Sequence, residues 1–102
     1  MNTDNIYMSV IYKFHKKLDG FDFYAPSTVD DKKYDVFFKN SVGRTVHVSF
    51  GDRNYQQFND KIGYYSSLDH MNQKRRLRYR ERHKNDDLNH LTPGYFSYYY
   101  LW

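Results

Sequence analysis

A chain of 102 residues with a net charge of +4 is long enough for one small domain and too short for two. Hydrophobic residues make up 39% and aromatic residues 21%, with 12 Tyr and 8 Phe, so we expect a core built from rings and some tyrosine on a contact surface. The absence of Cys excludes disulfides and thiolate metal sites, and no apolar run reaches the roughly 18 residues that span a bilayer. We therefore expect a soluble protein that is not classically secreted.

The N-terminal third contains one alternating segment followed by turns. Over residues 5–15 the apolar side chains recur at a spacing of two: Ile6, Met8, Val10, Tyr12 and Phe14. This alternation predicts a strand with one apolar face. Residues 16–33 contain the turn pairs Asp19-Gly20 and Pro26-Ser27, and the aromatic residues between them are interpreted as a short edge strand or a clamp over a neighbour. Residues 1–32 could thus form an N-terminal extension of the domain.

A hairpin is predicted over residues 33–50. Residues 33–39 and 44–50 are rich in β-forming side chains and alternate in polarity, and Asn40 and Gly43 occupy the short connection between them. Phe50 is expected to end the inward face of the second strand, and Gly51 to permit a sharp exit from it.

A basic helix is predicted over about residues 67–84, with Ser66, Ser67 or Asp69 as its N-cap. This segment lacks Gly and Pro and is rich in good helix formers. Positive and negative side chains cancel over residues 1–70, so the excess charge of the chain comes from this helix. Its basic residues are the candidates for binding a partner or phosphate: Lys74, Arg75, Arg76, Arg78, Arg80, Arg82 and Lys84.

At 3.6 residues per turn the basic side chains divide between two faces of the helix. Arg75, Arg78 and Arg82 fall on one face, and Arg76, Arg80 and Lys84 fall on another. Three interpretations are open. The arginines could bind the backbone of a nucleic acid while Tyr79 stacks on a base, they could contact acidic residues of a protein, or they could form a solvated face. The few apolar residues of the helix suggest that it rests lightly on its own domain.

The C-terminal segment, residues 88–102, is expected to be a docking tail. A turn at Thr92-Pro93-Gly94 precedes a dense aromatic run, and exposing that much apolar surface to water is unfavourable. The tail could dock on its own hairpin or on another chain. The residues predicted to dock are Tyr95, Phe96, Tyr98, Tyr99, Tyr100 and Trp102.

The sequence favours neither catalysis nor a metal site. Asp69 and His70 are adjacent, so on a helix they point to different faces. His70 and His83 are too far apart to share a metal on one helix, and His83 with His90 supplies only two imidazoles. We predict no enzyme, no cofactor and no catalytic or metal-binding residue.

One series of residues resembles a family of short basic proteins from nucleocytoplasmic large DNA viruses. The resemblance covers roughly residues 33–102 and is carried by Phe50, Gly51, Asp69, His70, Arg76, Tyr79, Arg82, His83, Gly94, Phe96, Ser97, Leu101 and Trp102. It provides no activity that can be transferred, and Phe50, Gly51, Asp69, His70, Tyr79 and His83 have no assigned role. What it implies is a component of the virion, assembled in the virus factory of the host cytoplasm.

These observations predict a single α+β domain: a small antiparallel sheet of about three strands, one basic helix and a docked aromatic C-terminal segment. The expected function is that of a non-enzymatic structural protein, a minor capsid component that contacts other virion proteins and assembles into oligomers through its aromatic and arginine-rich surfaces. The alternative is a nucleic-acid-binding protein whose arginine face meets phosphates, and a host-interaction module is a third interpretation.

Overall fold

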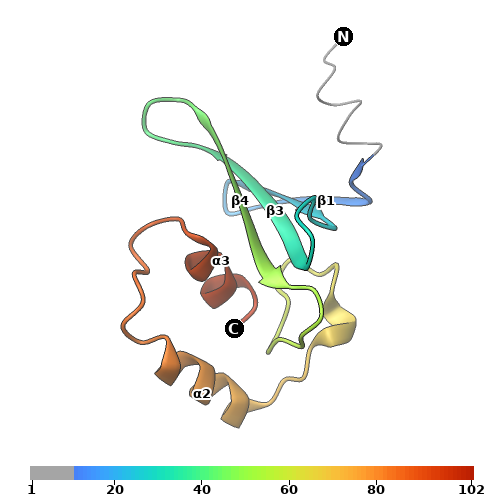
Figure 1. The fold of residues 1–102 in the computed structure, drawn as a ribbon, viewed down its shortest axis with the longest axis vertical. Coiled ribbons are helices and arrows are strands. Elements are labelled where there is room, and N and C mark those ends of the chain that lie inside the picture. Colours follow the sequence, from blue (N-terminus) through green and yellow to red (C-terminus); the bar gives the residue numbers. More distant parts are fainter. Residues whose placement is uncertain (1–10) are drawn as a thin grey trace.

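The structure is a computed structural model that describes residues 11–102. It confirms an α+β fold, with an antiparallel sheet followed by an irregular segment and two helices (Figure 1). The strands are β1 (Phe14–Leu18), β2 (Phe21–Ala25), β3 (Lys32–Lys39) and β4 (Thr45–Asp52). Each strand pairs with the next along the chain, in the order β1-β2-β3-β4. Neither helix of the described chain is long and apolar enough to cross a membrane.

The first hairpin differs from the prediction. Residues 5–10 of the predicted first strand lie outside the described residues, and within the described part the strand begins only at Phe14. Asp19 and Gly20 both adopt positive φ, 55° and 83°, which is the geometry of a tight two-residue hairpin turn. β2 therefore folds back between β1 and β3 as an interior strand, not as the edge strand that was expected.

The second hairpin confirms the prediction over residues 33–50. β3 and β4 pair with Val36 opposite Val48 and Tyr34 opposite Phe50. In the connection, the Asn40 side chain accepts hydrogen bonds from two backbone N–H groups, and Gly43 has a φ of 78°. The turn residues and the alternation of the flanking strands specify the same register, which explains why this hairpin can be predicted from the sequence.

The core lies between one face of the sheet and α3 (Pro93–Tyr100), which Figure 1 shows beside β4. Phe96 is fully buried, and its ring centroid lies 5.4 Å from that of Phe50 and 6.2 Å from that of Phe23. Thr92 caps α3, because its hydroxyl accepts a hydrogen bond from the Tyr95 N–H at 3.2 Å. The aromatic tail therefore docks on its own chain.

The basic helix is shorter than predicted. A 3-10 turn, η1 (Ser66–Leu68), is followed by extended residues, and α2 spans only Gln73–Arg82. The N-cap is Asn72, not Ser66, Ser67 or Asp69. The reason is tertiary: the His70 N–H donates to the Gln57 carbonyl at 2.9 Å and the Met71 N–H to the Phe58 carbonyl at 3.1 Å. These backbone bonds hold residues 70–71 against the 57–58 segment, and Met71 has a φ of 55°, so no helix can pass through them.

Candidate functional site

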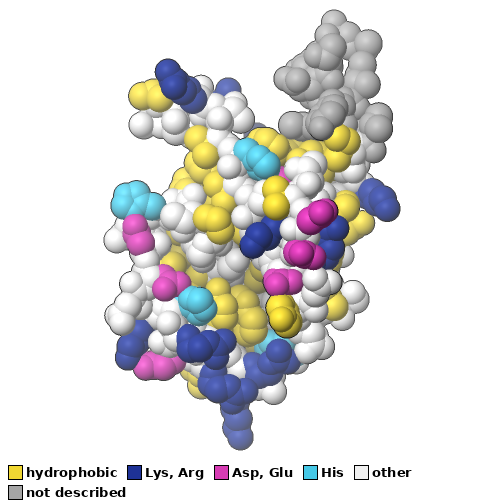
Figure 2. Space-filling view, viewed as in Figure 1, with side chains coloured by type: hydrophobic (Ala, Val, Ile, Leu, Met, Phe, Trp, Pro, Cys, Tyr) yellow, Lys and Arg dark blue, Asp and Glu magenta, His cyan; other side chains and the backbone are white. Residues whose placement is uncertain are grey.

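Helix α2 concentrates positive charge at the surface. Its sequence contains only helix-compatible residues, and the Asn72 side chain accepts a hydrogen bond from the Arg75 N–H at 3.1 Å. None of its side chains is buried. In the space-filling view, dark blue side chains gather at the end of the molecule where Figure 1 places α2 (Figure 2). The helix thus presents part of its positive charge to solvent.

Two of the predicted binding residues are used within the chain. Arg76 donates from Nε to the main-chain oxygen of Trp102 at 2.8 Å, and its guanidinium lies 4.8 Å from the ring centroid of Phe58. The guanidinium of Arg80 lies 4.6 Å from the ring centroid of Tyr98 and donates to its hydroxyl at 3.2 Å. Arg76 and Arg80 therefore anchor α2 to the C-terminal segment.

The opposite face of α2 lines a groove of about 220 Å³. Its walls are formed by Tyr55, Gln56, Arg75, Arg78, Arg82 and Trp102. Arg75 donates to the Gln56 side-chain oxygen at 2.9 Å, whereas Arg78 and Arg82 make no side-chain hydrogen bond within residues 11–102. The structure brings together the three arginines that the helical spacing places on one face. The structure also places Tyr55 in this groove. Its side chain is 69% exposed, and no pattern in the sequence predicts that it lies beside the arginines.

The charge of this groove is not neutralised by neighbouring carboxylates. Within residues 11–102, none of the five arginines of α2 forms an ion pair with Asp or Glu. Lys84, just beyond the helix, pairs with Glu81 at 2.7 Å, and Lys74 is exposed near the start of the helix. A cluster of guanidinium groups that is not paired with acidic side chains attracts anions, and its fork geometry matches phosphate and carboxylate.

The aromatic residues predicted to dock fall into three classes of exposure. Phe96 and Tyr100 are buried in the core, and the Tyr100 hydroxyl donates to Asp19 at 2.7 Å. Tyr95, Tyr98 and Trp102 are half-buried. Tyr99 is 42% exposed and is the most accessible ring of α3. Most of this aromatic surface is therefore occupied by contacts within the chain.

The positions that carry the viral resemblance form a connected structural assembly around the C-terminus. The ring of Tyr79 stacks on Trp102, and His83 packs on Tyr79 with centroids 4.2 Å apart. Asp69 accepts hydrogen bonds from the Gln57 side chain at 2.6 Å and from the Asp60 N–H at 2.7 Å.

His70, another of these positions, lies with its ring 5.2 Å from that of Trp102, and its Nδ1 accepts a hydrogen bond from the Asn72 N–H. Burial lowers the pKa of His70, which favours the neutral ring that this acceptor role requires. Asp69, His70, Tyr79 and His83 thus all have a structural role.

Gly51 lies at the end of β4 and is also required by a close approach. It adopts a φ of 78°, and a Cβ at this position would lie 3.0 Å from Leu101 Cδ1 and 3.1 Å from Lys33 Cβ. β4 continues through Gly51 to Asp52. The strand thus ends one residue after Gly51, where the exit was expected, and Gly51 in addition makes room for the C-terminal segment.

Each remaining histidine of this region pairs with one nearby carboxylate. His83 Nδ1 lies 2.6 Å from Asp86 Oδ2, and His90 Nδ1 contacts Asp87. Across residues 11–102 no group of three or more His, Cys, Asp or Glu side chains is arranged to hold a metal ion.

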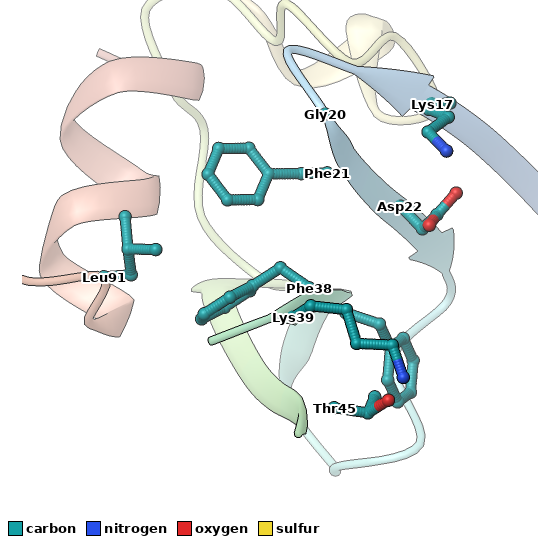
Figure 3. Close-up of a pocket in the computed structure, with 9 residues that line it drawn as sticks. Lys17, Gly20, Phe21, Asp22, Phe38, Lys39, Thr45 and Leu91 are labelled. Carbon is teal, nitrogen blue, oxygen red and sulfur yellow. The ribbon is translucent and has the colours of Figure 1, made fainter. Parts of the chain in front are cut away.

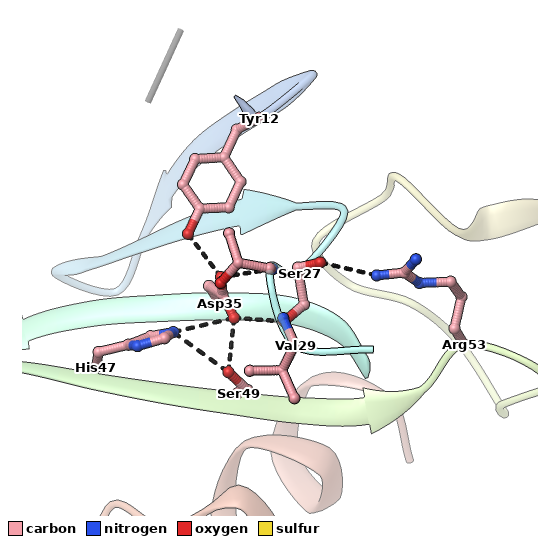
Figure 4. A network of polar contacts seen from close by, with 8 residues as sticks. Tyr12, Ser27, Val29, Asp35, His47, Ser49 and Arg53 are labelled. Carbon is pink, nitrogen blue, oxygen red and sulfur yellow. Dashed lines mark hydrogen bonds and ion pairs between the residues drawn. The ribbon is translucent and has the colours of Figure 1, made fainter. Parts of the chain in front are cut away.

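A buried carboxylate on the other face of the sheet was not predicted from the sequence (Figure 4). Asp35 is fully buried and accepts hydrogen bonds from Tyr12 at 2.6 Å, Ser49 at 2.7 Å and the Thr28 hydroxyl at 2.8 Å, as well as from Ser27. Burial alone would raise the pKa of Asp35, but these hydrogen bonds outweigh it and hold the pKa well below its usual range.

The Asp35 cluster also contains a serine and a histidine, but not in a catalytic arrangement. His47 Nε2 lies 3.0 Å from Asp35 Oδ1 and 3.2 Å from Ser49 Oγ. In a nucleophilic triad the two ring nitrogens of the histidine divide these roles, one contacting the acid and the other the hydroxyl. Here the same nitrogen faces both groups, and Ser49 already donates to Asp35. The cluster therefore orders the hairpin and does not activate a nucleophile.

A further pocket, of about 480 Å³, opens between β2, the tip of the second hairpin and Leu91 (Figure 3). Phe21 and Phe38 form an apolar wall. Charges of both signs also line the pocket, from Lys17, Lys39 and Asp22. Lys17 lies directly across the hairpin from Asp22. Because its charges are mixed, this pocket lacks the one-signed field of the arginine groove.

Comparison with known proteins does not assign the chain to a family. No family model, no curated protein and no solved structure matches it.

Proposed function

We propose that the protein is a non-enzymatic nucleic-acid-binding module whose contact surface is the groove formed by Arg75, Arg78 and Arg82. The observation that supports this most directly is that these three arginines line one groove while no carboxylate of the described chain pairs with them. Guanidinium groups bind phosphate bidentately, and three of them within two turns of helix can follow consecutive phosphates. In this proposal Arg76 and Arg80 position the helix and do not meet the ligand.

The structure gives less support to an aromatic clamp between virion proteins. That interpretation needs the rings of the tail to be available to a partner, but Phe96 and Tyr100 lie in the core and Trp102 is stacked on Tyr79. A role in the virion of a large DNA virus stays a prediction. If the protein has that role, the arginine groove favours contact with the packaged genome over contact with other virion proteins.

The test is a charge-matched comparison of binding. The variant Arg75→Gln/Arg78→Gln/Arg82→Gln and the control Lys16→Gln/Lys17→Gln/Lys39→Gln each remove three positive charges from exposed or half-exposed positions. Fluorescence anisotropy with a labelled oligonucleotide at about 50 mM salt measures affinity for each. We expect the arginine variant to lose at least tenfold in affinity and the lysine variant to lose little.

A competitor distinguishes phosphate from carboxylate ligands. Unlabelled poly-L-glutamate should displace the oligonucleotide only at much higher charge concentration than unlabelled DNA. Equal competition would replace the proposal with an acidic protein partner, and equal losses in the arginine and lysine variants would contradict a specific groove.

A further inference from the structure

A second cavity of about 280 Å³ adjoins the arginine groove. The two share four wall residues, namely Tyr55, Gln56, Arg82 and Trp102. Arginine side chains dominate the first cavity, whereas the second is lined in addition by neutral groups that include Gln57, Tyr79 and Ser97 and by the oppositely charged Lys33 and Asp52. One continuous depression therefore runs from a cationic end to an end of mixed charge.

The second cavity has an unsatisfied hydrogen-bond acceptor in its wall. Gln57 is 1% exposed, and its side-chain nitrogen donates to the Tyr65 carbonyl at 2.9 Å and to Asp69 at 2.6 Å. Its Oε1 has no hydrogen-bond partner within residues 11–102. A buried polar atom left unpaired is costly, and Gln57 also forms part of the cavity wall, so a shift of this side chain on binding would let a ligand N–H donate to it.

Flat aromatic rings and fixed polar groups surround this acceptor. Tyr79 and Trp102 are already stacked, and burial raises the pKa of Tyr79 to about 12, so its hydroxyl keeps its proton at neutral pH. Tyr55 stands at the junction of the two cavities. The Lys33 ammonium donates to the main-chain oxygens of Asp52 and Tyr55, the latter at 2.7 Å, and so fixes the loop that carries Tyr55.

We propose that this double depression binds single-stranded nucleic acid, with phosphates at Arg75, Arg78 and Arg82 and an unpaired base in the cavity beside Tyr55 and Gln57. The inference rests on the proposed function. A base offers a flat face for Tyr55 and ring or exocyclic polar groups for the polar side chains of the cavity wall. In a duplex the base faces are stacked and the pairing edges are occupied, so no base is free to enter the cavity, and the duplex is held through its phosphates at the arginines. The depression should therefore discriminate between single strands and duplexes.

The chain contains its own reporter for this event. Trp102 is the only tryptophan, and it lines both cavities. Because the indole borders the arginine groove as well, any nucleic acid bound in the depression changes its surroundings, and a base stacked beside Tyr55 adds to that change. The quenching by a single strand in excess of the quenching by a duplex thus reports occupation of the base cavity.

The experiment titrates the protein with one sequence of about twelve nucleotides, a length within the range that small single-strand binding sites cover. It is supplied as single-stranded DNA, as single-stranded RNA and as duplex DNA, and anisotropy and tryptophan fluorescence are recorded together. We expect single strands to bind at least tenfold more tightly than duplex and, at saturation, to quench Trp102 more strongly than duplex does. Comparing the affinities of the DNA and RNA single strands shows which of the two the protein prefers.

The variant Tyr55→Ala and its control Tyr99→Ala test the stacking contact. Both rings are exposed, at 69% and 42%, so both variants should fold, and Tyr99 lines neither cavity. Tyr55→Ala should weaken single-strand binding by roughly five- to one-hundredfold, the range found for stacked aromatic residues, and leave duplex binding unchanged. Tyr99→Ala should leave both unchanged.

Two results would overturn the inference in distinguishable ways. Equal affinity for single strands and duplex, with Tyr55→Ala altering neither, would leave the arginine groove as a phosphate site and remove the base cavity. Failure to bind either form at low salt would remove the proposed function together with the inference.

Discussion

The ring of Tyr79 stacks on the indole of Trp102, with centroids 4.3 Å apart and planes 4° from parallel. This contact joins α2 to the C-terminal segment, which the core holds through Leu101 and Tyr100. Since no residue of α2 is fully buried, its position depends on the stacking of Tyr79 on Trp102 and on the contacts of Arg76 and Arg80 with the C-terminal segment. The arginine groove is thus supported by the aromatic segment that follows it in the chain.

We predict that the arginines of α2 separate into structural and binding residues. Arg76→Ala removes a charge-assisted hydrogen bond to Trp102 and a contact with Phe58, and it should lower the free energy of unfolding by about 1.5–3 kcal/mol. Arg78→Ala, the matched control on the exposed face, should change it by less than about 0.5 kcal/mol. Urea unfolding followed by circular dichroism measures both, and equal effects would show that Arg76 does not anchor the helix.

A second prediction concerns the close approach at Gly51. Gly51→Ala places a methyl group against Leu101 and Lys33 in a backbone conformation that disfavours side chains, and it should destabilise the protein by about 2–4 kcal/mol. Gly43→Ala is the control, because Gly43 has the same φ of 78° but open space around its Cα. It should cost only about 1 kcal/mol. The difference in melting temperature between the two variants measures how much the steric contact at Gly51 contributes to the destabilisation. Equal melting temperatures would show that the contact contributes nothing.

The third prediction is a pH dependence that originates in Asp35. The folded-state pKa of this carboxyl is held below its unfolded value of about 3.9, mainly by hydrogen bonds from Ser27 and Ser49 that outweigh the effect of burial. The unfolded state therefore binds more protons in this range, and stability falls as the pH falls below about 4. The stabilisation is fully present above that pH and is lost progressively as the pH approaches the folded-state pKa.

Asp35→Asn tests this directly. It removes the charge that the surrounding hydroxyls solvate, so at pH 7 it should destabilise the protein by about 1.5–3 kcal/mol. Below pH 4 the difference from the unsubstituted protein should shrink. Asp30→Asn changes an exposed carboxylate and should alter stability little at either pH. A gap between the Asp35 variant and the parent that stays constant from pH 7 to pH 3 would contradict the account.

The sequence predicts the parts of the fold that are specified locally. The 33–50 hairpin combines alternating strands with Asn40 and Gly43 in the connection, and both signals concern neighbouring residues. The start of α2 depends instead on backbone hydrogen bonds from residues 70–71 to residues 57–58, which no local pattern reveals. Helix propensity alone therefore extends the helix too far towards the N-terminus.

The candidate site could be predicted in part. Helical spacing is sufficient to group Arg75, Arg78 and Arg82, because their relation is a property of one element. The same spacing cannot show that Arg76 and Arg80 are occupied by Trp102 and Tyr98, which lie some twenty residues further along the chain. Tyr55 and Gln57 reach the site through the fold of an irregular loop, so their contribution follows from the structure alone.

The salt dependence of nucleic-acid binding tests the central claim most directly. Association constants measured between about 50 and about 200 mM salt should give a log–log slope of about −2 to −3, as expected for three neutralised phosphates. The Arg75→Gln/Arg78→Gln/Arg82→Gln variant should bring the slope close to zero, and the Lys16→Gln/Lys17→Gln/Lys39→Gln control should retain it. A flat response of the unsubstituted protein, or a slope that the arginine variant leaves unchanged, would contradict phosphate binding by the groove of α2.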